Sequence, residues 1–138
     1  MKTAILFLSL VITSFTLKAQ AQIPDSKSYA GSWKLSKGLI HGSPETDGMF
    51  TINNPDGTFY TYTTVAKQES GKSFLQSGTY EMTSDSTCTV KILKHANSPE
   101  MVGAMILVKF RFEGSNTMHS LWKLERNGWM PEVWERVK

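Results

Sequence analysis

The chain has 138 residues and a formal net charge of +3, with a single cysteine, Cys88. This length suits one domain with one core, and one cysteine excludes an intrachain disulfide. Lys and Arg form no runs, so the composition argues against nucleic acid as a partner.

The amino-terminal segment has the three parts of an export signal. Lys2 supplies a positive charge, residues 4–17 form an apolar stretch, and Ala19-Gln20-Ala21 is a cleavage site with small residues. The apolar stretch is short and polar sequence follows it, which favours removal over stable membrane insertion. We therefore expect a signal peptide at 1–21 and a single exported domain at 22–138, periplasmic or secreted. Removal of Lys2 and Lys18 lowers the formal charge from +3 to +1.

Eight short segments with strand character follow, separated by clusters of Gly, Asn, Asp, Pro and Ser. They span residues 30–36, 47–53, 58–65, 73–82, 87–94, 105–113, 117–125 and 130–137. A series of this kind is typical of a sandwich or a barrel, and residues 97–104 fit a short helical turn. This series has Trp33 in its first segment and Arg136 in its last. Together these features predict an all-β fold, a small antiparallel up-and-down barrel closed by its first and last strands.

The turn Asn54-Pro55-Asp56-Gly57 predicts the register of the strands on either side of it. A three-residue bulged turn here pairs Asn54 with Thr58, Ile52 with Tyr60 and Phe50 with Tyr62. Directly paired residues share a face of the sheet. We expect this aromatic face to point inward, and the opposite face, with its threonines and Phe59, to point outward.

Arg126-Asn127-Gly128 predicts a second hairpin, for which two loop types are open. A three-residue bulged loop pairs Trp122 with Glu132, whereas a two-residue loop places Trp122 opposite Val133. The bulged loop is preferred because it gathers large side chains on one inward face. That face carries Met118, Trp122, Leu124, Met130, Glu132, Trp134 and Arg136.

The segment 105–113 has the clearest alternation of apolar and polar residues. Its apolar positions, Ile106, Val108, Phe110 and Phe112, face one way, and the charged residues Lys109, Arg111 and Glu113 face the other. On the preceding strand, Cys88 is expected to be a small buried residue, since free cysteines are usually buried.

Glu132 and Arg136 are two charged residues on an otherwise apolar face. Buried charge is costly unless it is paired. They therefore pair with each other, bind a polar group of a ligand, or reach water at the barrel ends. The aromatic residues around them either fill the core or form the wall of a cavity. The candidate ligand-binding residues are Tyr60, Tyr62, Trp122, Glu132 and Trp134.

The sequence contains no pattern of residues that predicts catalysis, a cofactor or a metal site. It lacks a phosphate-binding glycine loop, a His-Glu-x-x-His motif and paired cysteines, and His41, His95 and His119 are isolated. Glu132 could act as an acid or base, but one carboxylate without a partner is no mechanism. We therefore expect a binding protein in preference to an enzyme.

Three parts of the chain resemble a known family: Gly31-Ser32-Trp33, the pair Asp56-Gly57-Thr58-Phe59 and Ser77-Gly78-Thr79-Tyr80, and Glu132-Val133-Trp134-Glu135-Arg136-Val137. They resemble lipocalin-like (calycin) barrels, and more closely the small exported lipocalin-like bacterial domains of unknown function, over most of residues 29–137. The resemblance implies a structural contact at the barrel floor between Trp33 and Arg136. The chain is shorter than a typical secreted lipocalin and lacks its disulfide and long terminal helix.

The function that these features favour is an exported small-molecule-binding barrel with an aromatic-lined lumen. Its expected partner is a small apolar or aromatic ligand. The alternative is a structural or protein-interaction domain whose barrel is filled by side chains and takes no ligand. An open cavity in the structure would favour the first. The sequence defines neither the ligand nor the oligomeric state.

Overall fold

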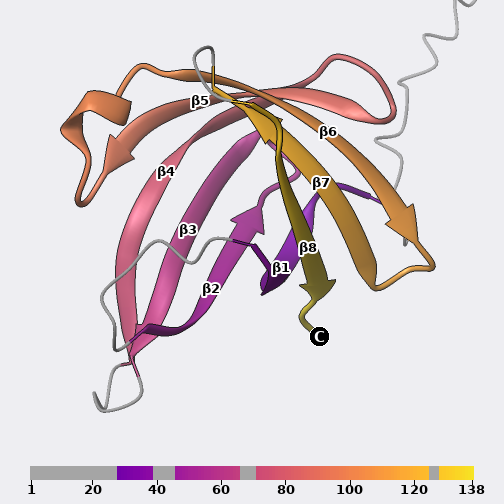
Figure 1. The fold of residues 1–138 in the computed structure, drawn as a ribbon, viewed down its shortest axis with the longest axis horizontal. Coiled ribbons are helices and arrows are strands. Elements are labelled where there is room, and N and C mark those ends of the chain that lie inside the picture. Colours follow the sequence, from indigo (N-terminus) through magenta and orange to yellow (C-terminus); the bar gives the residue numbers. More distant parts are fainter. Residues whose placement is uncertain (1–27, 39–45, 66–70, 125–127) are drawn as a thin grey trace, which may run out of the picture.

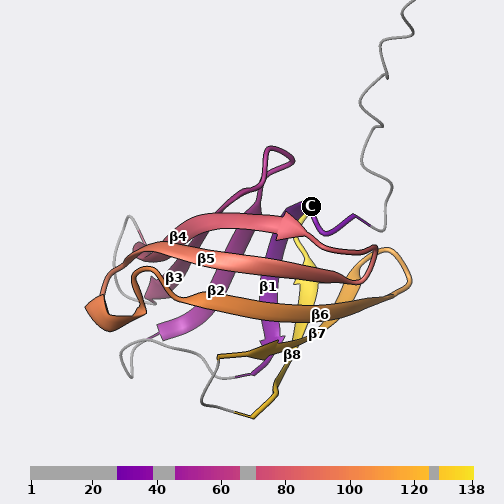
Figure 2. The same cartoon turned by 90° about the horizontal axis from the view of Figure 1, so that it is seen from above.

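A computed structural model describes residues 28–38, 46–65, 71–124 and 128–138. Within these residues, eight antiparallel strands form one closed barrel in chain order, and β1 pairs with β8 (Figures 1 and 2). The predicted all-β up-and-down barrel is confirmed. The strands are β1 (Gly31–Lys37), β2 (Thr46–Asn53), β3 (Thr58–Val65), β4 (Lys72–Met82), β5 (Thr87–His95), β6 (Met105–Glu113), β7 (Thr117–Lys123) and β8 (Met130–Arg136).

The strand boundaries agree with the sequence-based ones to within two residues at every end. The predicted helical turn is a short 3-10 helix, η1 (Pro99–Met101), between β5 and β6. Pro99 suits its first turn, because proline has no N–H to leave unpaired there. Within the described residues, no helix is long and apolar enough to cross a membrane.

The core consists of the apolar side chains on the inner faces of the strands. On β6, Ile106, Val108 and Phe110 are buried while Lys109, Arg111 and Glu113 are exposed, as the alternation predicts. Cys88 is also fully buried, as expected. The barrel core therefore follows the two-residue period of the strands.

The register of β2 and β3 is as predicted, but the prediction of which face points inward is wrong. Ile52 pairs with Tyr60 and Phe50 with Tyr62. The inner face instead holds the buried residues Met49, Thr51, Asn53, Phe59, Thr61 and Thr63. The hydroxyls of Thr51 and Thr61 can be buried because they hydrogen-bond to each other, and Met49 and Phe59 supply the apolar surface of that face.

The register of β7 and β8 matches neither of the two loop types considered. Trp122 pairs with Met130, Ser120 with Glu132 and Met118 with Trp134. The connection is longer than three residues and includes 125–127, which lie outside the described residues. The shift from the preferred register is two residues. Since side chains alternate with a period of two, Trp122, Glu132 and Trp134 still share the inner face.

One end of the barrel is closed by Trp33 on β1 and by Tyr29, which precedes that strand. Trp33 is fully buried there, and its indole N–H donates to the carbonyl oxygen of Tyr29 at 3.1 Å. The Tyr29 ring packs on Phe110 and Tyr80. The opposite end carries η1, which Figure 1 shows beyond the end of β5. The fold therefore has one sealed end and one end where η1 lies beside the opening.

Candidate functional site

The barrel encloses a cavity of about 610 Å³. Its wall is mainly apolar, with side chains from most of the strands and from η1. The apolar lining residues are Met49, Phe59, Leu75, Val90, Ile92, Met101, Ile106, Val108, Met118, Trp122, Leu124 and Trp134. A concave apolar space with a few polar groups is the usual form of a small-molecule site.

Three of the five predicted ligand-binding residues line this cavity: Trp122 on β7, and Glu132 and Trp134 on β8. Tyr60 and Tyr62 are not among the residues that line it, because their face of β3 points outward. The expectation that these tyrosines line the lumen is therefore wrong.

The outward tyrosines belong to an exterior aromatic cluster on β2, β3 and β4, formed by Phe50, Tyr60, Tyr62 and Phe74. Tyr62 stacks on Phe50 with ring centroids 5.1 Å apart, and Tyr60 lies against Phe74 at 5.6 Å. The Lys72 ammonium lies 4.9 Å from the centre of the Tyr62 ring. Mutual ring contacts and lysine stems cover part of this apolar area, which explains how the aromatic face can be the outer one.

Glu132 is an acidic residue in the cavity wall, where it is partly buried. It pairs directly with Ser120 across β7 and β8, and its Oε2 accepts a hydrogen bond from the Trp134 indole at 3.0 Å. Desolvation by burial raises the pKa of the Glu132 carboxyl, and hydrogen bonds from Trp134, Trp122 and Ser120 oppose that rise. A carboxyl group in such a place can bind a donor group of a ligand.

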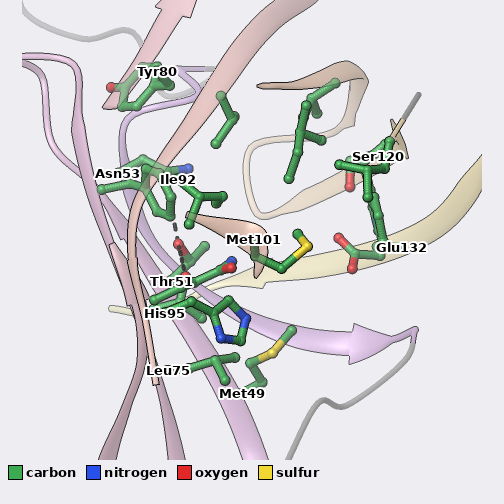
Figure 3. Close-up of a pocket in the computed structure, with 18 of the residues that line it drawn as sticks. Met49, Thr51, Asn53, Leu75, Tyr80, Ile92, His95, Met101, Ser120 and Glu132 are labelled. Atoms are coloured by element: carbon green, nitrogen blue, oxygen red, sulfur yellow. Dashed lines mark hydrogen bonds between the residues drawn. The ribbon is translucent and has the colours of Figure 1, made fainter. Parts of the chain in front are cut away.

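Across the cavity from Glu132, β2 and β3 present a set of hydrogen-bonded polar side chains. Thr61 donates to Thr51 at 3.2 Å, Thr51 donates to Asn53 at 3.4 Å, and Asn53 donates to the Tyr29 carbonyl at 3.2 Å. Figure 3 shows Thr51 and Asn53 on the opposite side of the cavity from Ser120 and Glu132. This set was not predicted from the sequence, because the threonine face was expected to point outward.

The region near η1 contributes a second group of residues that was not predicted from the sequence. His95 and Met101 line the cavity here and lie beside it in Figure 3. The Nδ1 atom of His95 accepts hydrogen bonds from the backbone N–H groups of Asn97 and Ser98, at 3.3 and 3.1 Å. Asn97 and Ser98 were the sequence features that could have indicated this group, because serine and asparagine favour tight local turns.

The other candidates lie away from the cavity or are sealed within the core. His119 contacts Glu113 at 2.6 Å on the outer surface, and His41 is outside the described residues. Burial raises the pKa of the Cys88 thiol to about 11, which makes a reactive thiolate scarce. In the described part of the chain, no group of three His, Cys, Asp or Glu residues is placed to hold a metal ion.

Arg136 is placed at the closed end, where it was expected to contact Trp33. Its guanidinium carbon lies 4.1 Å from the centre of the Trp33 ring system. It also donates to the carbonyl oxygens of Ser28, Ala30 and Ser115. Arg136 therefore closes the barrel and is not one of the residues that line the cavity.

Comparison with known proteins identifies a family without a described function. The family model described as "Domain of unknown function (DUF4488)" matches residues 28–138. This span covers all the strands of the barrel, and the chain belongs to this family. No curated protein matches the sequence.

Proposed function

We propose that this DUF4488 protein is an exported barrel that binds a small, mainly apolar molecule inside its lumen. The observation that carries the proposal is the cavity of about 610 Å³ among the described residues. Ligand pockets of proteins usually measure ~300–1,000 Å³ and combine an apolar wall with a few polar groups. A barrel filled by its own side chains would have no such space.

A lipocalin-like classification is part of this proposal. It is supported by the up-and-down order of the strands and by the contact between Trp33 and Arg136 at the closed end. Eight strands form a barrel wide enough to hold one small ligand, as in lipocalins.

Export is the second part of the proposal, and it rests on residues 1–21, which lie outside the described residues. Lys2, the apolar stretch and Ala19-Gln20-Ala21 support cleavage after Ala21. Amino-terminal sequencing of the protein from the periplasm or medium should begin at Gln22. An intact Met1 on exported protein would contradict this part alone.

A second candidate function, a protein-interaction domain, has one observation in its favour. The exterior aromatic cluster leaves Tyr60 37% and Phe74 36% exposed on a sheet surface. Aromatic residues are enriched where proteins bind one another. This function would not need the cavity, so blocking the cavity distinguishes the two.

The test compares two tryptophan substitutions on neighbouring positions of β6. Ile106 lines the cavity, whereas Leu107 is 40% exposed on the outer surface. Native mass spectrometry of the mature wild-type protein, purified without denaturant, should detect a retained small molecule. Ile106→Trp should lose it and Leu107→Trp should keep it. Retention by a folded Ile106→Trp variant would contradict binding in the lumen.

A further inference from the structure

The described lining of the cavity contains acidic residues but no Lys or Arg. Glu132 lies in the wall and Glu100 lies on η1 at the opening. Among the described residues that line the cavity there is no Lys or Arg. Lys109 and Lys123, by contrast, are exposed on the outer surface of β6 and β7. An organic anion that enters the cavity would therefore meet negative charge and no Lys or Arg side chain from the described lining.

The remaining lining residue that could carry a positive charge is His95. Its Nδ1 accepts backbone hydrogen bonds from Asn97 and Ser98, so this nitrogen holds the turn that follows β5 and is not available to a ligand.

The surroundings of Glu132 fit a cationic group. The Trp134 indole donates to its carboxyl, and Trp122 lines the cavity beside it. The stem of Glu132 lies close to Gly38, where an added Cβ would come within 3.1 Å of the Glu132 Cγ. A carboxylate in a mainly apolar wall is a favourable place for an ammonium group, because its negative charge attracts a cation and its oxygens can accept a charge-assisted hydrogen bond.

We propose that the cavity selects ligands that carry a protonated amine on an apolar body, that Glu132 receives the ammonium group, and that organic anions are rejected. This inference rests on the proposed function, because it assigns a ligand class to the same cavity. Partial desolvation disfavours the ionised form of Glu132 and raises the pKa of its carboxyl, and an ammonium partner would favour the ionised form again. After removal of Lys2 and Lys18 the formal charge is +1, so attraction to the protein as a whole would not favour a cation.

The test uses three probes with the same ring system: 1-naphthylmethylamine, 1-naphthylmethanol and 1-naphthoic acid. Calorimetric titration of the mature protein should give a Kd for the amine at least roughly tenfold below that of the acid, with the alcohol between them. In the wild-type protein this preference should persist in 1 M NaCl, where the Debye length is about 3 Å and surface attraction is screened. NMR shifts confined to cavity residues would locate the bound probe.

Glu132→Gln is the matched variant, since it keeps the shape of the side chain and removes the charge. It should bring the amine and the acid to similar affinity and leave the alcohol unchanged. Glu135→Gln is the control, because Glu135 lies on the same strand, β8, but is exposed on the outer surface. This control removes the same charge from the protein and should keep the preference for the amine.

Each outcome of this experiment tests a different claim. If the alcohol binds but the acid binds as tightly as the amine, the inference about ligand class is wrong and lumen binding stands. The inference is also wrong if folded Glu132→Gln keeps the preference for the amine. If none of the three probes binds, the proposed function fails together with the inference.

Discussion

The guanidinium of Arg136 lies over the indole of Trp33, with its carbon 4.1 Å from the ring centre. The same side chain donates to the carbonyl oxygens of Ser28, Ala30 and Ser115, at 3.0, 3.2 and 3.0 Å. Arg136 thus connects the segment before β1, the turn between β6 and β7, and the last strand. One side chain holds together three parts of the closed end.

Replacing Arg136 should destabilise the barrel. Arg136→Ala removes a cation–π contact and three hydrogen bonds to backbone, for a loss of about 1–3 kcal/mol in the free energy of unfolding. Arg136→Lys should recover only part of this, because an ammonium cannot reproduce the planar set of donors. Urea denaturation measures both. Arg111→Ala, at an exposed position on β6, is the control and should change stability little.

Gly78 should tolerate no side chain. It lies where the register of β4 and β5 shifts, and an added Cβ would lie 1.9 Å from the carbonyl oxygen of Lys91. Gly78→Ala should therefore cost more than about 3 kcal/mol or prevent folding, since backbone must move. Gly114→Ala should cost only about 1 kcal/mol, because that site has a φ of +64° but open space around it. Similar melting temperatures for the two variants would contradict this account.

Cys88 should react slowly with alkylating agents in the native protein. Burial raises the pKa of its thiol from 9.0 to about 11, which lowers the thiolate fraction at pH 8 roughly a hundredfold. Mass spectrometry after iodoacetamide treatment should show little modification without denaturant and complete modification in urea. A Cys88→Ser/Thr89→Cys variant moves the thiol to the next position on β5 and should react faster. Rapid labelling of native Cys88 would show that the site is not sealed.

Glu132 should make stability depend on pH. Burial raises the pKa of its carboxyl above the ordinary value of 4.5. Its contribution to the free energy of unfolding is therefore fully present below pH 4.5 and is lost as the pH rises through the raised pKa. The loss is about 1.4 kcal/mol for every tenfold change that folding makes in the acid dissociation constant. Relative to Glu132→Gln, the wild-type protein should lose stability between pH 4 and pH 8. Melting curves of both proteins measure the difference, and a constant difference would contradict the assignment.

Trp122 and Trp129 should differ in their effect on ligand binding. Trp122 lines the cavity, whereas Trp129 is 37% exposed with the Lys109 ammonium 4.6 Å from its ring centre. Trp122→Ala should weaken binding of 1-naphthylmethanol, and Trp129→Ala should leave it nearly unchanged. Equal losses in calorimetric titrations would place the ligand elsewhere.

Much of the fold could be predicted because short strands, turns and alternation are local signals. The Asn54-Pro55-Asp56-Gly57 turn predicted the register of β2 and β3, and β6 showed its buried face directly. The contact between Trp33 and Arg136 was also foreseen, through the family resemblance. These features depend on neighbours in the chain or on a recognisable motif.

Hydrophobicity alone could not predict which face of β2 and β3 points into the barrel. Tyr60 and Tyr62 have larger apolar surfaces than Thr61, yet the tyrosines lie outside, where they contact each other and Lys72. Thr61 is buried because its hydroxyl has a partner on β2. Phe59, on the threonine face, was the signal for the correct choice, since a buried aromatic residue fixes the parity of the whole strand.

The pairing of β1 with β8 has a consequence for how the protein is made. Ala30 and Arg136 are 106 positions apart, so the barrel closes only after its last strand has left the ribosome. Until then, β1 and the last completed strand present unpaired edges, which are prone to aggregate. Contacts of such long sequence separation also make folding slow. Loss of the final strand would leave this vulnerable state permanent, and a chaperone that holds the emerging chain would be expected to raise the yield of folded protein.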